Sequence, residues 1–248
     1  MTSGKRVLAG FHAVGARLRH APQSIESLLI DARRRDARMS DLIERAKAFG
    51  VRVVNADHDR LRGLAGDSPH QGVVALASEI DRAVSLDEVL QQADANTFLL
   101  LLDGVTDPRN LGACLRVADA AGVNAVIVPR DRAAGLTASA SKAAAGAAET
   151  LPLIAVTNLA RAMDELRDGG IRLIGAAAEA GKSLYEMNLR GPIAWVLGAE
   201  GSGLRRLTRE RCDELVHIPL AGQVESLNVS VAAGICLFES RRQRLQTS

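Results

Sequence analysis

The polar residues best suited to chemistry lie in three loops, each following an apolar run that reads as a strand. The first loop follows residues 98–102 and leads to Asn110 and Arg116 on the next predicted helix. Asn110 has the type and place of a helix N-cap. Arg116 could form a surface ion pair, or hold a phosphate through its planar guanidinium. Taken singly, each residue has both a structural and a functional interpretation.

The second loop is rich in glycine and follows the apolar run at residues 193–197. It reads Gly198-Ala-Glu200-Gly201-Ser-Gly203, and three glycines allow a backbone to approach a ligand closely. A phosphate-binding Walker loop would end in Gly-Lys-Ser/Thr, and the glycine order here reverses that of a dinucleotide-binding fingerprint. No neighbour in the sequence is an evident partner for Glu200, which favours a functional role for its carboxylate.

The third loop runs from Ile218 to Ser230 and contains Pro219 and Leu220. The preceding strand ends at the proline and a polar segment follows it. Either Ser226 or Asn228 then begins the last predicted helix. An ordinary N-cap explains each of these two residues singly. Three such loops, all after strands, indicate a site together more strongly than any one does.

The elements that must position these loops alternate between strand and helix over the last 150 residues. Fully apolar strands separated by helices are typical of a parallel sheet covered on both faces, and ligands bind such sheets beyond the carboxyl ends of the strands. We predict strands at 98–102, 123–128, 171–174, 193–197 and 215–218, and helices at 111–121, 138–148, 159–167, 204–212 and 229–244.

A smaller α/β unit precedes this part of the chain. We predict helices at 11–20 and 40–49, the second capped by Ser40 and stopped by Gly50, and strands at 27–30, 51–54 and 72–77. Residues 80–96 are expected to form a linker, with Ser85 and Glu88 as the capping box of a short helix. The expected domains are therefore 1–79 and 97–248.

Composition excludes several classes of protein. Of the 248 residues, 47% are hydrophobic and 24% are charged, which excludes disordered and collagen-like chains. No apolar run approaches the roughly 20 residues of a membrane helix, and the N-terminus does not read as a signal peptide. We therefore expect a cytoplasmic protein that does not enter membranes. The three cysteines, Cys114, Cys212 and Cys236, are expected to be reduced core thiols, and their spacing indicates no metal site.

The distribution of charge is compatible with a nucleic-acid partner. Residues 1–80 hold 13 Lys and Arg against 9 Asp and Glu, and 27 of the 31 basic residues of the chain are arginine. Arginine suits bidentate phosphate contacts, and if the partner is RNA we expect Arg17 and Arg33–Arg35 to contact its phosphates. By composition alone, a solvated surface in a genome that prefers arginine codons is favoured instead. Aromatic residues make up only 2% of the chain, too few for a base-stacking platform.

Together the three loops resemble the three signature motifs of the SpoU/TrmH group of SPOUT RNA methyltransferases, in the same order and spacing. Asn110 and Arg116 match the first motif, residues 198–201 the second, and residues 218–220 and 226–230 the third. Residues 9–14 and 70–73 resemble the small RNA-binding domain of the same group. Residues 102–116, 205–210 and 229–239 resemble most the bacterial members that methylate a guanosine ribose of 23S rRNA, in the P loop of the peptidyl-transferase centre.

The resemblance implies a fold and a set of ligands. It implies an α/β SPOUT catalytic domain with a parallel sheet and a C-terminal trefoil knot, preceded by a small α/β RNA-binding domain like ribosomal protein L30e. It also implies a homodimer whose active site takes residues from both subunits, with 23S rRNA as substrate. The cofactor would be S-adenosylmethionine, and the positions implied to hold it are Gly198, Ile218, Leu220, Ser226 and Leu227.

The implied catalytic residues are Asn110, Arg116, Glu200 and Asn228. Arg116 matches the residue with the central catalytic role in the family. Because a guanidinium is hardly ever deprotonated in proteins, we expect it to act electrostatically and by orientation, with Glu200 or solvent receiving the proton. The two asparagines would fix the ribose and Arg116. We expect no metal.

Three alternatives stay open from the sequence. A tRNA 2′-O-methyltransferase of the same group would share all three motifs, although the N-terminal domain favours rRNA. A non-catalytic RNA-binding assembly factor could keep the fold, but the intact motif residues argue against it. A nucleotide-dependent oxidoreductase is disfavoured because the Gly-x-Gly-x-x-Gly fingerprint is absent.

Overall fold

The computed structural model describes residues 5–66, 68–78, 85–131 and 133–246. The chain divides into two compact units, Met1–Arg82 with Ala145–Thr150, and Ala83–Ala144 with Leu151–Ser248. The expected linker over 80–96 lies partly outside the described residues, at 80–84. Its described remainder contains α4 (Leu86–Gln91) with the predicted capping box of Ser85 and Glu88.

The first unit is a mixed sheet with helices on both faces. The strands are β1 (Lys5–Ala9), β2 (Ile25–Asp31), β3 (Val53–Ala56) and β4 (Val73–Ser78), in the order β1-β4-β2-β3. Strand β4 is antiparallel to β1 and β2, and β3 is parallel to β2. Helices α1 (Phe11–His20) and α2 (Ala37–Ala48) form one core with the sheet, and α3 (His58–Ala65) packs on Leu29 and Val74 in another.

Two predicted details of this unit are wrong. Helix α2 begins at Ala37 because the carboxylate of Asp36 accepts a hydrogen bond from the backbone N–H of Met39 at 3.2 Å, so Ser40 lies inside the helix. The strand predicted at 51–54 lies at 53–56. Strand β1 and helix α3 were not predicted, because both are short and rich in charged residues.

The second unit contains a parallel sheet, as predicted. In the described part of the chain its strands follow the order β7-β6-β5-β10-β8-β11-β9, and every neighbouring pair is parallel. The strands are β5 (Phe98–Asp103), β6 (Ala125–Pro129), β7 (Leu153–Val156), β8 (Arg172–Ala176), β9 (Lys182–Ser183), β10 (Ile193–Gly198) and β11 (Glu214–His217).

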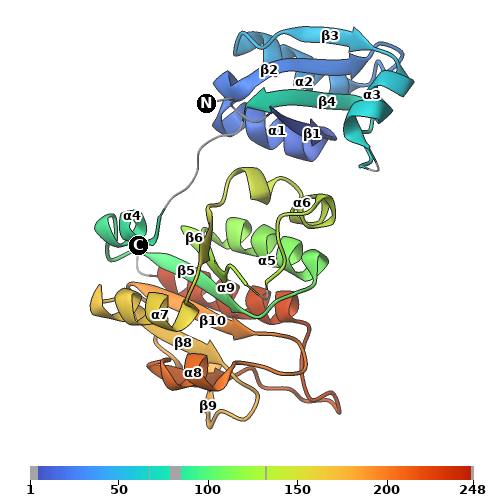
Figure 1. Ribbon diagram of the computed structural model, residues 1–248. Helices are drawn as coiled ribbons and strands as arrows, with labels where there is room; N and C mark the ends of the chain where they lie inside the picture. The colour runs from blue at the N-terminus through green and yellow to red at the C-terminus, as the bar shows by residue number, and fades with distance from the viewer. Residues whose placement is uncertain (1–4, 67, 79–84, 132, 247–248) are drawn as a thin grey trace. The chain divides into compact units, whose positions relative to one another are not determined.

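Helices cover both faces of this sheet (Figure 1). On one face α4 and α7 (Leu159–Asp168) pack on alternate strand residues such as Leu99, Leu101 and Val196. On the other lie α5 (Pro108–Ala121) and α9 (Val229–Leu245), which pack on each other. Burial of the strands on both faces explains their continuous apolar sequence. No described helix has the length and apolar character needed to span a bilayer.

Two predicted helices of this unit are shorter than expected. Helix α6 (Ala138–Ala144) ends where Ala145 and Gly146 take positive φ angles of 50° and 100°, and residues 147–149, which belong to the first unit, form a separate 3-10 turn. Helix α8 spans only Arg206–Glu210. Strands β7 and β9 were not predicted, because both are short and lie at the two edges of the sheet.

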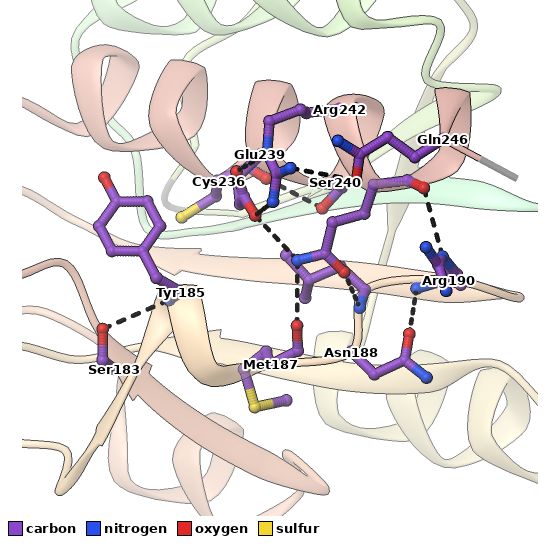
Figure 2. A network of polar contacts seen from close by, with 12 residues as sticks. Ser183, Tyr185, Met187, Asn188, Arg190, Cys236, Glu239, Ser240, Arg242 and Gln246 are labelled. Carbon is purple, nitrogen blue, oxygen red and sulfur yellow. Dashed lines mark hydrogen bonds and ion pairs between the residues drawn. The ribbon is translucent and has the colours of Figure 1, made fainter.

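Helix α9 is anchored to the sheet along its C-terminal half. The indole N–H of the fully buried Trp195 on β10 donates to the Ser240 hydroxyl at 2.8 Å. One turn later the Gln243 side chain accepts from the backbone N–H of Leu189 at 2.9 Å and donates to the carbonyl of Met187 at 3.0 Å. Figure 2 shows the segment that contains Met187 and Asn188 beside helix α9. These contacts fix the axis of α9, whose first turn lies at the candidate site.

Candidate active site

The first loop brings Asn110 to the start of α5 without using it as a cap. Asp107 is the N-cap residue, and its carboxylate accepts from the backbone N–H of Arg109 at 2.8 Å, with Pro108 in the first turn. The capping interpretation of Asn110 is therefore wrong, and its amide is available for other contacts. Arg116 lies further along α5, is exposed, and makes no hydrogen bond or ion pair with the described residues.

The second loop folds back on the end of β10. Gly198 pairs in register with Asp103 of β5, and a Cβ built on Gly198 would lie 2.0 Å from the carbonyl carbon of Gly203. The Gly203 N–H donates to the carbonyl of Ala199 at 2.9 Å, which closes the loop at its base. Only glycine fits at position 198, and the loop carries the exposed carboxylate of Glu200 at its turn.

The third loop ends at Asn228, the N-cap residue of α9. The Asn228 Oδ1 atom accepts from the backbone N–H of Ser230 at 2.9 Å and from its hydroxyl at 2.6 Å. Of the two predicted candidates for the start of this helix, Asn228 is therefore the cap. Because Oδ1 is used in capping, the Nδ2 group is left to donate outward.

Asn110, Glu200 and Asn228 meet in one hydrogen-bonded cluster. The Nδ2 group of Asn228 donates to Asn110 Oδ1 at 3.0 Å and lies 3.3 Å from Glu200 Oε2, and Asn110 Nδ2 donates to the same carboxylate oxygen at 3.2 Å. The partners of Glu200 come from two other loops, 90 and 28 positions away, which agrees with the absence of an evident partner among its neighbours in the sequence. One carboxylate oxygen that accepts from two amides is a charge-assisted arrangement, and it leaves Oε1 open.

A pocket of about 530 Å³ adjoins the cluster and is lined by the second and third loops. Glu200 is part of its lining, so the cluster and the pocket share a carboxylate. The five predicted cofactor positions all line it: Gly198, Ile218, Leu220, Ser226 and Leu227. Its volume is within the range of small-molecule sites, and the combination of apolar side chains with glycine backbone is typical of them.

Sequence reasoning missed several residues around this pocket. Residues 176–179, at and after the end of β8, also line it, and Asp103 and Arg205 join the first and second loops. Asp103 carried a signal, since it is the polar residue that ends an apolar strand. Arg116 is the one predicted catalytic residue that has no contact with the cluster in the described part of the chain.

Titratable side chains outside this cluster give no metal centre in the part of the chain that the structure describes. Within the described ranges, no group of three or more His, Cys, Asp or Glu side chains is arranged to hold a metal ion. All three cysteines are free thiols, as predicted, but only Cys114 and Cys236 are buried in the core, whereas Cys212 is partly buried against it. Burial raises the pKa of Cys114 and of Cys212 to about 12, and raises the pKa of Cys236 as well.

The first unit presents arginines around the start of α1. Arg34 and Arg38 lie over the ring of Phe11, with guanidinium carbons 4.6 and 4.5 Å from the ring centre. Arg33, Arg35 and Arg38 are exposed. Arg17 differs, because only 2% of it is exposed and its Nε donates to the Glu149 carboxylate at 3.0 Å. The prediction that Arg17 contacts RNA phosphate is therefore wrong.

Family comparisons agree with this architecture. Residues 97–238 match the model of the SpoU rRNA Methylase family, and residues 7–83 match a model described as RNA 2′-O ribose methyltransferase substrate binding. The chain therefore belongs to the SpoU rRNA methylase family.

Individual relatives carry more specific names. The chain is 58% identical to the 23S rRNA (guanosine-2′-O-)-methyltransferase RlmB of Ralstonia nicotianae, over 98% of this chain and 97% of the relative. It is also 58% identical to the enzyme of the same name from Bordetella pertussis, over 96% and 98%. Among solved structures it is similar to the SpoU methyltransferase AviRb from Streptomyces viridochromogenes in complex with the cofactor AdoMet. The TM-score is 0.77 and the identity 26%, over 98% of this chain and 91% of that one.

Proposed function

We propose that the chain transfers a methyl group from S-adenosylmethionine (AdoMet) to the ribose 2′-oxygen of a guanosine in 23S rRNA. The observation that carries this proposal is the cluster of Asn110, Glu200 and Asn228 beside the pocket of the glycine loop. Membership of the family, the activity named for the Ralstonia and Bordetella relatives, and the cofactor in the AviRb structure support it.

The residues of the pocket fit AdoMet. Gly198 lines the pocket with backbone alone, and because it has no Cβ the returning part of the loop at Gly203 can close against it. Ile218, Leu220 and Leu227 provide apolar contact, and Ser226 provides a hydroxyl. These five residues would hold the cofactor, which supplies a methyl group on a positively charged sulfur when bound. Because the thioether leaves without a proton, the chain needs no general acid for it.

The cluster and Arg116 are proposed to prepare the attacking oxygen. Asn110 and Asn228 orient the ribose, and Glu200 or solvent takes the proton of the 2′-hydroxyl as the oxygen–carbon bond forms and the carbon–sulfur bond breaks. Arg116 stays protonated. It anchors the adjacent phosphate and stabilises the negative charge that develops on the oxygen.

A homodimer is part of the proposal, because Arg116 has no contact with the cluster of its own chain. Helix α9, which packs on α5, leaves Val231 and Phe238 half exposed, as an apolar contact between subunits would require. In such a dimer, Arg116 of the partner subunit would complete the site. The trefoil knot of the SPOUT fold is proposed on family membership and on the loops that line the pocket.

We assign RNA binding to residues 1–79, proposed to be like ribosomal protein L30e, with 80–96 as linker and 97–248 as catalytic domain. Arg33, Arg35 and Arg38 are exposed beside Arg34 and Phe11, and this arginine-rich surface fits RNA phosphates. A cytoplasmic location fits an rRNA substrate and three free thiols.

The test is a transfer assay with labelled AdoMet and the full chain. Protein-free 23S rRNA and total tRNA are offered separately, and the products are digested to nucleosides. We expect label in 2′-O-methylguanosine from 23S rRNA only. Label in tRNA would support the tRNA enzyme of the same group instead. Absence of transfer to either RNA, with intact protein, would contradict an enzymatic role on free RNA.

A further inference from the structure

The buried carboxylate of Asp103 is not used by the proposed chemistry. Asp103 ends β5 opposite Gly198 of β10, and only 1% of it is exposed. Its Oδ2 accepts a hydrogen bond from the backbone N–H of Arg205 at 3.0 Å. Its Oδ1 lies 3.5 Å from Arg205 Nε and has no hydrogen-bond partner in the described part of the chain. Burying a carboxylate so incompletely satisfied is costly, which calls for a reason.

Arg205 is the residue at which the glycine loop ends. The loop is closed at its base by the contact of Gly198 with Gly203, and Arg205 follows two residues later as the first residue of the turn into α8. The hydrogen bond from its N–H to Asp103 therefore holds the returning end of the loop against β5. Both ends of the loop are then fixed at one point, because its other end is Gly198, the register partner of Asp103.

The side chain of Arg205 extends the same connection to the first loop. A Cβ atom built on Gly104 would lie 3.0 Å from the Nη2 atom of Arg205, so the guanidinium packs against this glycine. Gly104 has a φ of +80°. Gly104 follows Asp103 directly, at the start of the loop that leads to Asn110. One residue pair thus joins the loop that carries Asn110 to the loop that carries Glu200, and these two side chains are hydrogen-bonded at 3.2 Å.

We propose that Asp103 and Arg205 are positioning residues that hold the glycine loop in the form that binds AdoMet and that places Glu200 against Asn110. The inference rests on the proposed function. Neither residue needs to touch the reacting atoms, since they act through the loop they fix. A carboxylate that served stability alone would have no connection to cofactor affinity.

The test compares Asp103→Ala with Asp213→Ala in the full-length protein. Asp213 is the matched control, because its Oδ2 also accepts from a backbone N–H, that of Leu173 at 2.8 Å, but near the amino end of β8. Titration calorimetry with AdoMet is expected to give a Kd raised at least tenfold by Asp103→Ala and changed less than twofold by Asp213→Ala. Asp103→Asn keeps an acceptor oxygen and is expected to recover part of the loss.

Each possible result either supports or overturns the positioning role of Asp103 and Arg205. Wild-type affinity in a folded Asp103→Ala variant, or an equal loss in Asp213→Ala, overturns the positioning role while the proposed function stands. If Asp103→Ala does not fold, Arg205→Pro replaces it, since proline removes the N–H that Asp103 accepts and fits the φ of −63° at this position. An unchanged Kd in Arg205→Pro then overturns the inference. If the wild-type protein itself takes up no AdoMet, the proposed function fails, and this inference fails with it.

Discussion

The Nδ2 group of Asn228 donates a hydrogen bond to the Oδ1 atom of Asn110 over 3.0 Å, although 118 positions separate the two residues in the sequence. The same Asn228 side chain caps α9 through its other atom, Oδ1. One residue thus fixes the start of a helix and the geometry of the cluster. The two roles use different atoms, so they can be separated by substitution.

Asn228→Asp is expected to keep the helix cap and lose the cluster. Aspartate retains an oxygen for the Ser230 N–H but has no N–H to donate to Asn110 or Glu200. A hydrogen bond to a charged group contributes about 1.5–3 kcal/mol, so turnover should fall roughly tenfold to a hundredfold. The same change at the N-cap of α7, Asn158→Asp, is the control. If the two variants have the same Tm and the same turnover, a role for the cluster is contradicted.

Arg116→Ala is expected to remove turnover while leaving AdoMet affinity and stability in place. The side chain is exposed on α5, so little packing is lost, while loss of charge stabilisation at the reacting oxygen should lower kcat by at least about a hundredfold. Arg116→Lys should recover little, because an ammonium lacks the planar fork. Arg161→Ala, at another exposed helix position, is the control. A fully active Arg116→Ala enzyme would remove this residue from the mechanism.

Ser240→Ala is expected to destabilise the protein through Trp195. Both residues are fully buried, and the substitution leaves the indole N–H without its 2.8 Å acceptor. The free energy of unfolding in denaturant should fall by about 1–3 kcal/mol. Ser40→Ala, on an exposed face of α2, should change it by less than about 0.5 kcal/mol. A Ser240→Ala variant as stable as wild type would mean that the indole finds another partner.

The cysteines are expected to react slowly in the folded protein. With a pKa of about 12 for Cys114 and Cys212 against an ordinary value of 9.0, the thiolate needed for alkylation is scarce at pH 8. Unfolded thiols release their protons first, so the free energy of unfolding should fall as the pH rises from about 9 to 12. Thiol titration before and after unfolding measures the first effect. Rapid reaction of all three thiols in native protein would contradict their raised pKa values.

The fold could be predicted where burial decides the residue types. Leu99–Leu102 and Ile193–Leu197 are apolar because helices cover both sheet faces, and this pattern is visible in the sequence. Strand β9 has two residues at a sheet edge, and the end of α6 depends on a positive φ at Ala145. Neither has a local signal. The N-cap of α2 is Asp36 and not Ser40. The sequence does not distinguish the two, because both residue types suit an N-cap position.

The candidate site could be predicted by residue type but not by pairing. Each loop contains a residue of the right chemistry at the end of a strand, which is a local property. The partners of Glu200 lie 90 and 28 positions away, so no window of sequence contains them. Arg17 was misassigned for the same reason, since its partner Glu149 is 132 residues distant.

The most direct test of the central claim maps ribose methylation in the large-subunit rRNA of the source cells, with and without this protein. The account predicts that one 2′-O-methylguanosine of 23S rRNA disappears with the protein. It should return with the wild-type chain and stay absent with Arg116→Ala. An unchanged methylation pattern in 23S rRNA, or a lost methyl group in tRNA, would contradict the account.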